Sequence, residues 1–209
     1  MGRNKKFHFD NVYYHSPLEY EHINLYQIGD LYCDSGYEVY EHEQYCYEIS
    51  YIVSGKGRFY TGANAYELSA GDVHICTPGD THRIKADIDD PFRFFYFGFS
   101  FTQYEGKRNE FEHIKKMFDS IDHHVARDDL NLAAKFLGIF NEILQPREHS
   151  HTMMKTYLNQ IVILTYRNFF DDWTRLYAKD VLNSGARHIV YQIINYVDNN
   201  LYEIHELPQ

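Results

Sequence analysis

Residues 47–57, YEISYIVSGKG, decide the fold that the sequence predicts. Their first seven positions are rich in β-branched and aromatic residues, and Ser54-Gly55-Lys56-Gly57 then supplies a turn signal. Similar strand-like runs, bounded by Gly, Pro, Asn and Asp, recur before Gln103, as at residues 73–76 and 92–101. Many short strands at close, regular spacing predict an antiparallel sandwich or barrel rather than βαβ units.

The pattern changes to a helical period after Gln103. Apolar residues recur at helical spacing over residues 128–144, and Gln145-Pro146 ends this helix because proline cannot continue the hydrogen-bond ladder. A second helix is expected from about Ser150 to Phe170, and the short connection predicts a hairpin. A third helix is expected over residues 184–200. The predicted fold class is thus β-rich α+β, with an antiparallel barrel followed by a helical hairpin and a C-terminal helix.

The composition restricts the class of protein. The chain has 209 residues, and 20 Lys and Arg stand against 30 Asp and Glu, for a formal net charge of -10. Phosphate contacts need clustered Lys and Arg, so this balance argues against strong nucleic-acid binding by the chain itself. Three cysteines without a CxxC pair favour a reducing cytoplasm, and no apolar run reaches membrane-spanning length.

Four side chains have the spacing of a single site: His42, Gln44, Glu48 and His82. Positions i, i+2 and i+6 share one face of a strand, so the first three face together if one strand runs through them or resumes in register after a turn. His82 follows the 77–81 turn and begins another strand. Converging imidazoles and a carboxylate could hold a divalent transition metal, and they could equally bind a small polyol by hydrogen bonds. The alternative is that both histidines are satisfied interior side chains.

The second predicted helix carries two apolar stripes. Met153, Tyr157 and Leu164 form one stripe, and the other consists of Met154, Leu158, Ile161 and Val162. One stripe can pack within the chain, which leaves the other for a partner, most simply a second copy in a homodimer. The predicted dimer contacts are Met154, Tyr157, Leu158 and Ile161. The alternative is that both stripes are intramolecular core.

Two stretches resemble the motifs of the cupin family. Residues 36–55 are similar to the first motif, and residues 71–82 are similar to the second. Gln44 stands where metal-binding cupins have a second His, and Gln is a poor ligand for the metals that imidazole suits. No cofactor is therefore expected, and a metal, if bound, would be held by His42, Glu48 and His82.

The whole chain resembles the AraC/XylS family of bacterial transcription regulators. The residues that carry this resemblance are 48–57, 68–72, the turn from Pro78 to His82, the helical hairpin, and 189–200, which is similar to the opening helix of the family's DNA-binding domain. The resemblance implies a cupin-like ligand-binding barrel at 1–102 and a helical dimerisation region at 103–178. Residues 179–209 would be a linker and the first helix of a truncated DNA-binding domain, whose helix-turn-helix units would lie beyond Gln209.

The same resemblance implies the walls of a ligand pocket. Ile84, Phe94 and Tyr96 match positions that line the sugar pocket in the arabinose-sensing member, and His42, Gln44, Glu48 and His82 would complete the lining. The expected function is a cytoplasmic effector-binding and dimerisation domain, not an enzyme, which senses a small molecule such as a saccharide and controls an attached DNA-binding domain. The N-terminal segment 7–14 is a candidate arm over the pocket. The alternatives are a small metal-dependent cupin enzyme, an isomerase or dioxygenase, and a dimerisation module with a vestigial pocket.

Overall fold

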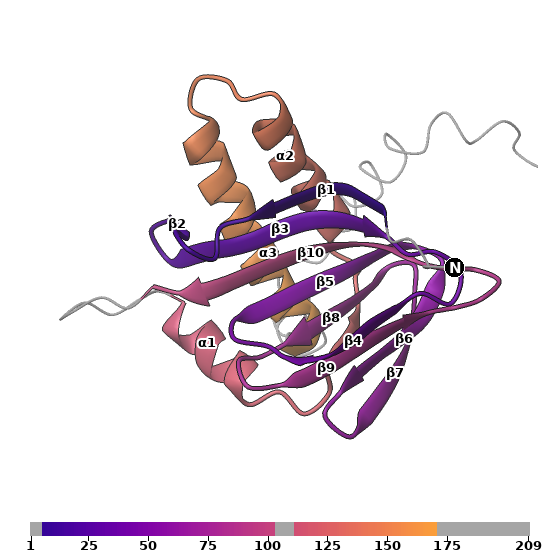
Figure 1. The fold of residues 1–209 in the computed structure, drawn as a ribbon. Helices are drawn as coiled ribbons and strands as arrows, with labels where there is room; N and C mark the ends of the chain where they lie inside the picture. Colours follow the sequence, from indigo (N-terminus) through magenta and orange to yellow (C-terminus); the bar gives the residue numbers. More distant parts are fainter. Residues whose placement is uncertain (1–5, 103–110, 171–209) are drawn as a thin grey trace, which may run out of the picture. The chain divides into compact units, whose positions relative to one another are not determined.

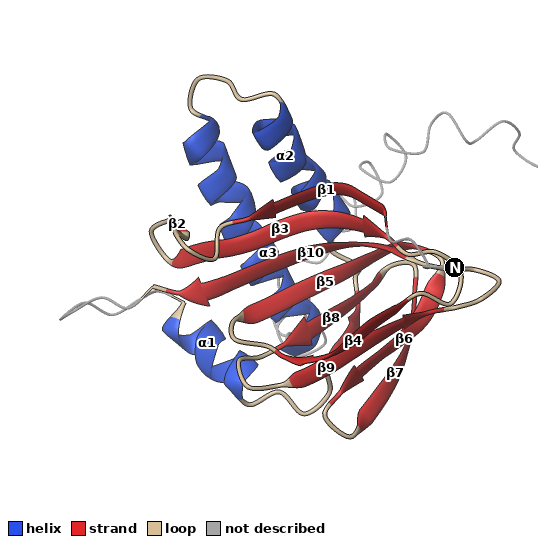
Figure 2. Cartoon of the chain, viewed as in Figure 1, coloured by secondary structure: helices blue, strands red, loops and turns tan. Residues whose placement is uncertain are grey.

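The computed structural model describes residues 6–102 and 111–170, in which the strands form two antiparallel sheets (Figure 1). In chain order the elements are β1 (Lys6–Val12), β2 (Leu18–Glu19), β3 (Ile23–Tyr32), β4 (Glu38–Glu43), β5 (Tyr47–Ser54), β6 (Lys56–Thr61), β7 (Asn64–Ser69), β8 (Asp72–Cys76), β9 (Thr81–Ala86), β10 (Arg93–Phe101), α1 (Glu112–Asp119), β11 (Val125–Arg127), α2 (Leu132–Leu144) and α3 (Ser150–Phe170). Strands thus precede the helices, apart from the short β11 (Figure 2).

The two sheets enclose one hydrophobic cluster. The larger sheet has the order β1-β3-β10-β5-β8-β11, with β2 paired to β3, and the smaller has the order β4-β9-β6-β7. The buried residues of this cluster come from both sheets and the loops beside them: Leu31, Cys33, Ile52, Phe59, Leu68, Ile84, Ala86, Phe92, Phe94 and Tyr96. The arrangement confirms the predicted β-rich, cupin-like fold with helices after the barrel.

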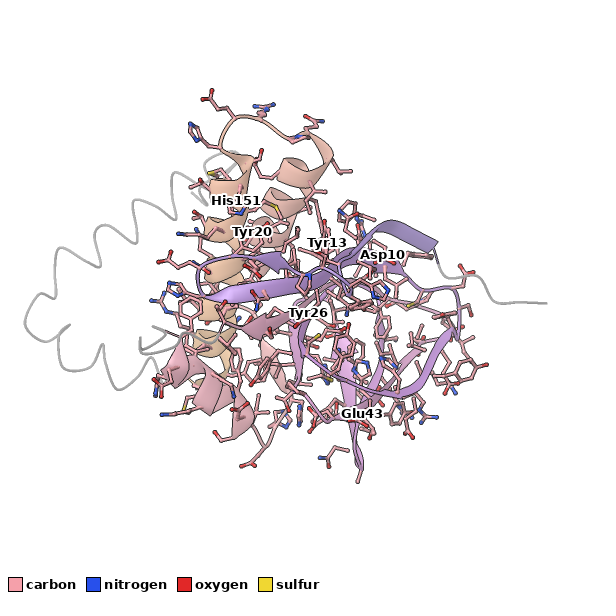
Figure 3. The ribbon with its side chains drawn as sticks, turned by 60° about the vertical axis from the view of Figure 1, so that its left-hand side comes forward. Asp10, Tyr13, Tyr20, Tyr26, Glu43 and His151 are labelled. Atoms are coloured by element: carbon pink, nitrogen blue, oxygen red, sulfur yellow. The ribbon has the colours of Figure 1, made fainter. Side chains whose placement is uncertain are left out.

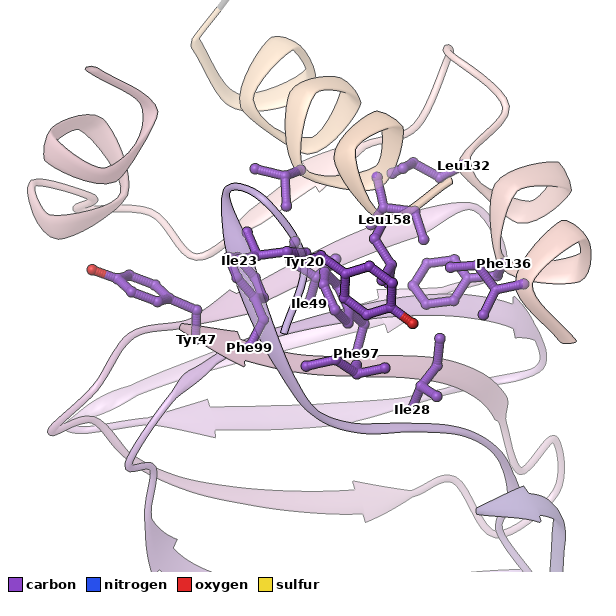
Figure 4. Packing of buried hydrophobic residues seen from close by; sticks show 14 of the residues in the cluster. Tyr20, Ile23, Ile28, Tyr47, Ile49, Phe97, Phe99, Leu132, Phe136 and Leu158 are labelled. Atoms are coloured by element: carbon purple, nitrogen blue, oxygen red, sulfur yellow. The ribbon is translucent and has the colours of Figure 1, made fainter. Parts of the chain in front are cut away.

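The helices cover the other face of the larger sheet. Phe136 of α2 and Leu158 of α3 belong to the same buried cluster as Ile28, Ile49 and Phe97 of the sheet (Figure 4). Both predicted hairpin helices are present, and α3 has the predicted bounds. The Asn131 side chain accepts a hydrogen bond from the Ala134 amide, which caps the first turn of α2.

Strand β10 is buried on both faces. Phe94 and Tyr96 belong to the cluster between the sheets, whereas Phe95 and Phe97 belong to the cluster under the helices. Successive side chains of a strand point to opposite faces, so a strand between two cores must be apolar at nearly every position. The FRFFYFGFSF run at residues 92–101 follows from this placement.

The boundary predicted after residue 102 separates strands from helices, yet the core crosses it. Phe118 of α1 lies with its ring centroid 6.2 Å from that of Phe101, and both are buried. Residues up to Phe170 form one compact unit. The sequence did not predict α1 and β11, because they are short and α1 buries Ile114 and Phe118 alone among its residues. The third helix at 184–200 and the boundary at 178 lie outside the described residues.

Three of the four dimer contacts predicted on α3 do not lie on a free surface. Met154, Leu158 and Ile161 are buried within the chain, in the cluster between α3, α2 and the larger sheet. Tyr157 is half-buried and packs so closely on Gly138 of α2 that a Cβ there would overlap its ring. The period of α3 revealed its apolar stripes, but the sheet beneath it supplies the cover. No described helix is both long and apolar enough to cross a membrane.

Candidate functional site

A cavity of about 330 Å³ lies between the two sheets. All seven residues that the sequence predicted as ligand-binding line it: His42, Gln44, Glu48, His82, Ile84, Phe94 and Tyr96. They come from β4, the β4–β5 turn, β5, β9 and β10. The structure therefore brings the whole predicted set to one place, and its volume is in the range of small-molecule sites.

Backbone hydrogen bonds hold the two motif turns together. The Gln44 amide donates to the Asp80 carbonyl at 2.8 Å, and the Gly79 amide donates to the Gln44 carbonyl at 2.7 Å. Gly79 has a φ of 94°, which favours glycine because other residues meet steric clashes there. On the adjoining strands His42 pairs with His82 in register. Two segments about 40 positions apart thus place their polar side chains side by side.

The two imidazoles form one hydrogen-bonded chain. His42 Nδ1 lies 2.9 Å from the Tyr40 carbonyl, which accepts only, so this nitrogen carries the proton. When His42 is neutral, its Nε2 must accept from His82 Nε2, 2.8 Å away. His82 Nδ1 then accepts from the Cys76 thiol at 2.9 Å. Burial lowers the pKa of His82 and raises the pKa of Cys76, which keeps both groups neutral in this chain.

Glu48 is the centre of a separate polar network. Its Oε2 accepts hydrogen bonds from Gln27 Nε2 at 2.7 Å and from Gln44 Nε2 at 3.0 Å. Tyr14 in turn donates its hydroxyl hydrogen to Gln27 Oε1. The side chains of β3 and of the β4–β5 turn therefore fix the carboxylate at the cavity wall.

The polar residues of the cavity do not fit a metal ion. Each nitrogen of the His42–His82 pair has a hydrogen-bond partner, and Glu48 Oε2 is shared by two amides. The two imidazoles and the carboxylate belong to different networks, and no group of three or more His, Cys, Asp or Glu in the described residues is arranged to hold a metal. The donor set instead offers separate acceptors and donors to an organic ligand.

The N-terminal segment, which the sequence offered as a candidate arm over the pocket, supplies one wall of the cavity, although none of its residues was predicted to line it. Asp10, Val12 and Tyr14 line the cavity. Tyr96 donates its hydroxyl hydrogen to Asp10 Oδ1 at 2.6 Å, and burial followed by this bond raises the pKa of Tyr96. Asp10 lies on β1, as Figure 3 shows. The period-2 spacing of 10, 12 and 14 was the available signal, but it does not reveal which sheet edge the segment joins.

Further lining residues were also missed. Gln27 lies on β3, Tyr45 lies in the β4–β5 turn, and Leu31 and Val39 add apolar surface. Gln27 and Leu31 stand outside both motifs, so only the pairing of β3 brings them to the cavity, whereas Val39 and Tyr45 lie within the first motif and were not predicted to line a pocket.

Two buried histidines predict that the protein loses stability as the pH falls. Burial lowers the pKa of His82 and holds that of His74, which is hydrogen-bonded to Thr61, well below 6.5. The unfolded chain then takes up protons more readily than the folded one, so stability is retained above about pH 6.5 and lost as pH falls toward the folded pKa values. In urea titrations from pH 7.5 to 5, we expect a loss of up to about 1.4 kcal/mol per pH unit for each residue. His74→Gln should flatten this dependence and exposed His15→Gln should not; equal slopes in all three proteins would contradict the assignment.

Two sheets around a cavity of small-molecule size, backed by a helical layer, define a ligand-binding domain of the cupin-like class. A family model described as the AraC-like ligand binding domain matches residues 24–162. This match covers more than half of the chain, which therefore belongs to the family of AraC-like ligand-binding domains and confirms the resemblance found in the sequence.

One relative is a named regulator. The Msm operon regulatory protein of Streptococcus mutans serotype c (strain ATCC 700610 / UA159) is 25% identical over 95 residues, which is 46% of this chain and 34% of that protein. The matched part of the chain thus spans about a third of the relative's length.

Two solved structures are also similar to part of the chain. A RmlC-like cupin from Shewanella frigidimarina NCIMB 400 is 20% identical, with a TM-score of 0.32 over 36% of this chain and 73% of that chain. KdgF from Halomonas sp. is 19% identical, with a TM-score of 0.32 over 36% of this chain and 77% of that chain.

Proposed function

We propose that this chain is the effector-binding and dimerisation part of a transcription regulator, with a small molecule held in the cavity between the sheets. The observation that carries the proposal is the convergence of all seven predicted residues on one cavity of about 330 Å³. Regulation of an attached DNA-binding domain is the corresponding role, as the family and the regulator from Streptococcus mutans suggest.

The chemistry of the walls suits a ligand with both apolar and polar faces. Phe94 and Tyr96 lie with ring centroids 6.2 Å apart and offer aromatic surface, to which Ile84 adds an aliphatic wall. Gln44 and Glu48 present hydrogen-bonding groups on the same cavity. A saccharide has this combination of C–H faces and hydroxyl groups, which makes it a suitable effector class.

Strand β1 provides a route from the cavity to the helices. Asp10 accepts the Tyr96 hydroxyl at the cavity, and the neighbouring Phe9 packs on Phe140 of α2 with ring centroids 5.3 Å apart. A ligand that competes for Tyr96 or Asp10 would alter the position of β1 and so its packing on α2. Such a ligand acts by binding one of two arrangements more tightly than the other.

Dimerisation through the helical hairpin would use its exposed side chains rather than the buried stripe. Leu137 and Leu144 of α2 and Met153 of α3 are exposed. Exposed apolar side chains on the hairpin favour a partner surface, and a second copy is the simplest partner.

Blocking the cavity tests the proposal. A thermal-shift panel of neutral, basic and acidic sugars should contain a compound that raises the unfolding temperature, because a ligand of the folded state adds about 2.7 kcal/mol of stability at 100 times its dissociation constant. Val39→Trp, which fills the cavity, should reduce that shift at least tenfold. Tyr40→Trp, at the next and 83% exposed position of β4, is the matched control and should leave it unchanged. An equal shift in both variants would place binding elsewhere.

A further inference from the structure

The charge of the cavity identifies the class of ligand more closely. Two carboxylates, of Asp10 and Glu48, line it, and none of the described lining residues is Lys or Arg. The imidazoles of His42 and His82 also line it and are hydrogen-bonded to each other, and burial lowers the pKa of His82 and so favours its neutral form. We propose that the cavity binds a ligand carrying a protonated amine or quaternary ammonium group, held against Glu48, and that it rejects anions. This inference rests on the proposed effector-binding function.

A comparison of two buried acids supports the inference. Asp30 is 5% exposed and Glu48 is 8% exposed. The Asp30 carboxylate accepts hydrogen bonds from both Nε and Nη2 of Arg93, at 2.8 and 2.5 Å. In the described part of the chain, no Lys, Arg or His forms an ion pair with Glu48. Buried charges are as a rule paired with a charge of opposite sign, and the unpaired carboxylate is the one that faces the cavity.

The hydrogen bonds of Glu48 leave one oxygen available. Oε2 accepts from the amides of Gln27 and Gln44, whereas the contact recorded for Oε1 is the Ser50 hydroxyl at 3.4 Å. A carboxylate can accept about four hydrogen bonds. An ammonium group at Oε1 would supply both the missing donor and the missing positive charge.

Aromatic rings complete a cation site around the carboxylate. The rings of Tyr14, Tyr45, Phe94 and Tyr96 line the same cavity, and Tyr14 and Tyr45 meet edge to face with centroids 5.2 Å apart. The faces of such rings attract ammonium groups through their quadrupoles. Anionic compounds would instead face two carboxylates, with no Lys or Arg among the described lining residues to offset the repulsion.

Two series of compounds matched in shape test the inference on the full chain by calorimetry. The first is D-glucosamine, D-glucose and D-glucuronate, and the second is choline, 3,3-dimethylbutan-1-ol and 3,3-dimethylbutyrate. In at least one series we expect the cation to bind at least tenfold more tightly than the neutral compound and the anion not to bind. Glu48→Gln should reduce the cation's advantage below twofold. Tightest binding by a neutral or anionic compound, an unchanged advantage in Glu48→Gln, or no binding by any of these compounds would overturn the inference. The effector-binding proposal would remain, because the sugar panel and the Val39→Trp variant test it separately.

The protein without ligand gives an independent test. Glu48→Gln keeps the shape and the acceptor for Gln27 and Gln44, and it removes an uncompensated charge, so its unfolding temperature at pH 7 should rise by about 2–4 °C. Asp30→Asn makes the same change where Arg93 compensates the charge, and its unfolding temperature should fall. A fall in Glu48→Gln as large as that in Asp30→Asn would show that Glu48 is already compensated and would overturn the inference.

Discussion

Leu158→Ala is expected to lower the free energy of unfolding by about 2–5 kcal/mol, the range for removing a buried leucine side chain. Leu158 is fully buried between α3, α2 and the larger sheet, where it shares a cluster with Phe136 and Phe97. The truncation leaves a cavity that the sheet cannot collapse to fill, because β10 is also packed on its opposite face. Urea denaturation followed by circular dichroism measures the change.

Leu137 provides the matched control on the other helix of the hairpin. It is 48% exposed, so Leu137→Ala should change the free energy of unfolding by less than about 0.5 kcal/mol. Leu137→Lys should leave a folded chain that sediments as a monomer if the exposed hairpin face forms the dimer, whereas Leu158→Lys should not fold. A folded, monomeric Leu158→Lys protein would mean that Leu158 lies in the dimer contact, and it would contradict the burial of Leu158 between α3, α2 and the larger sheet.

Gly29→Ala is expected to cost about 1–3 kcal/mol and to weaken effector binding at least tenfold, because it forces a buried ring to move. Gly29 of β3 pairs with Tyr96 of β10, and a Cβ at Gly29 would overlap the hydroxyl end of the Tyr96 ring. The displaced ring must leave Asp10 and enter the cavity, which it would then obstruct. Urea denaturation and calorimetry with a compound identified in the sugar panel measure the two effects.

A double-mutant cycle distinguishes a clash with the Tyr96 ring from any other effect of alanine at position 29. Tyr96→Leu removes the ring that collides, so the Gly29→Ala/Tyr96→Leu protein should be more stable than the sum of the single changes predicts, by about 1 kcal/mol or more. Additive effects would mean that the ring of Tyr96 does not lie over Gly29.

Much of the candidate site was predictable from short-range pattern. His42, Gln44 and Glu48 line one cavity, but the strand parity expected for them does not bring them together, because Gln44 lies in the turn and His42 and Glu48 lie in different sheets that face each other. The shared parity of Phe94 and Tyr96 did hold, since both belong to the cluster between the sheets. Period-2 alternation is a local property of a strand, and it survives whichever strand becomes the neighbour.

Asp10, Tyr14 and Gln27 were not predictable in the same way. Their place in the site depends on β1 pairing with β3 and on β3 pairing with β10, and a shift of one residue in either register would turn them to the opposite face. Pairing between strands far apart in sequence follows from packing of the whole core, so it cannot be predicted from any single segment.

By itself, the sequence determined the strand-rich first half, the helical hairpin, the four polar positions of the two motifs and the acidic balance of the chain, because spacing, turn residues and composition are local quantities. Only the tertiary structure decided that the buried α3 stripe is covered by the sheet, that Asp10 of β1 lines the cavity, and that Asp30 has a positive partner whereas Glu48 has none among the described residues. Burial and charge pairing depend on which surfaces meet in space, and that outcome is settled by the assembly of all the elements together.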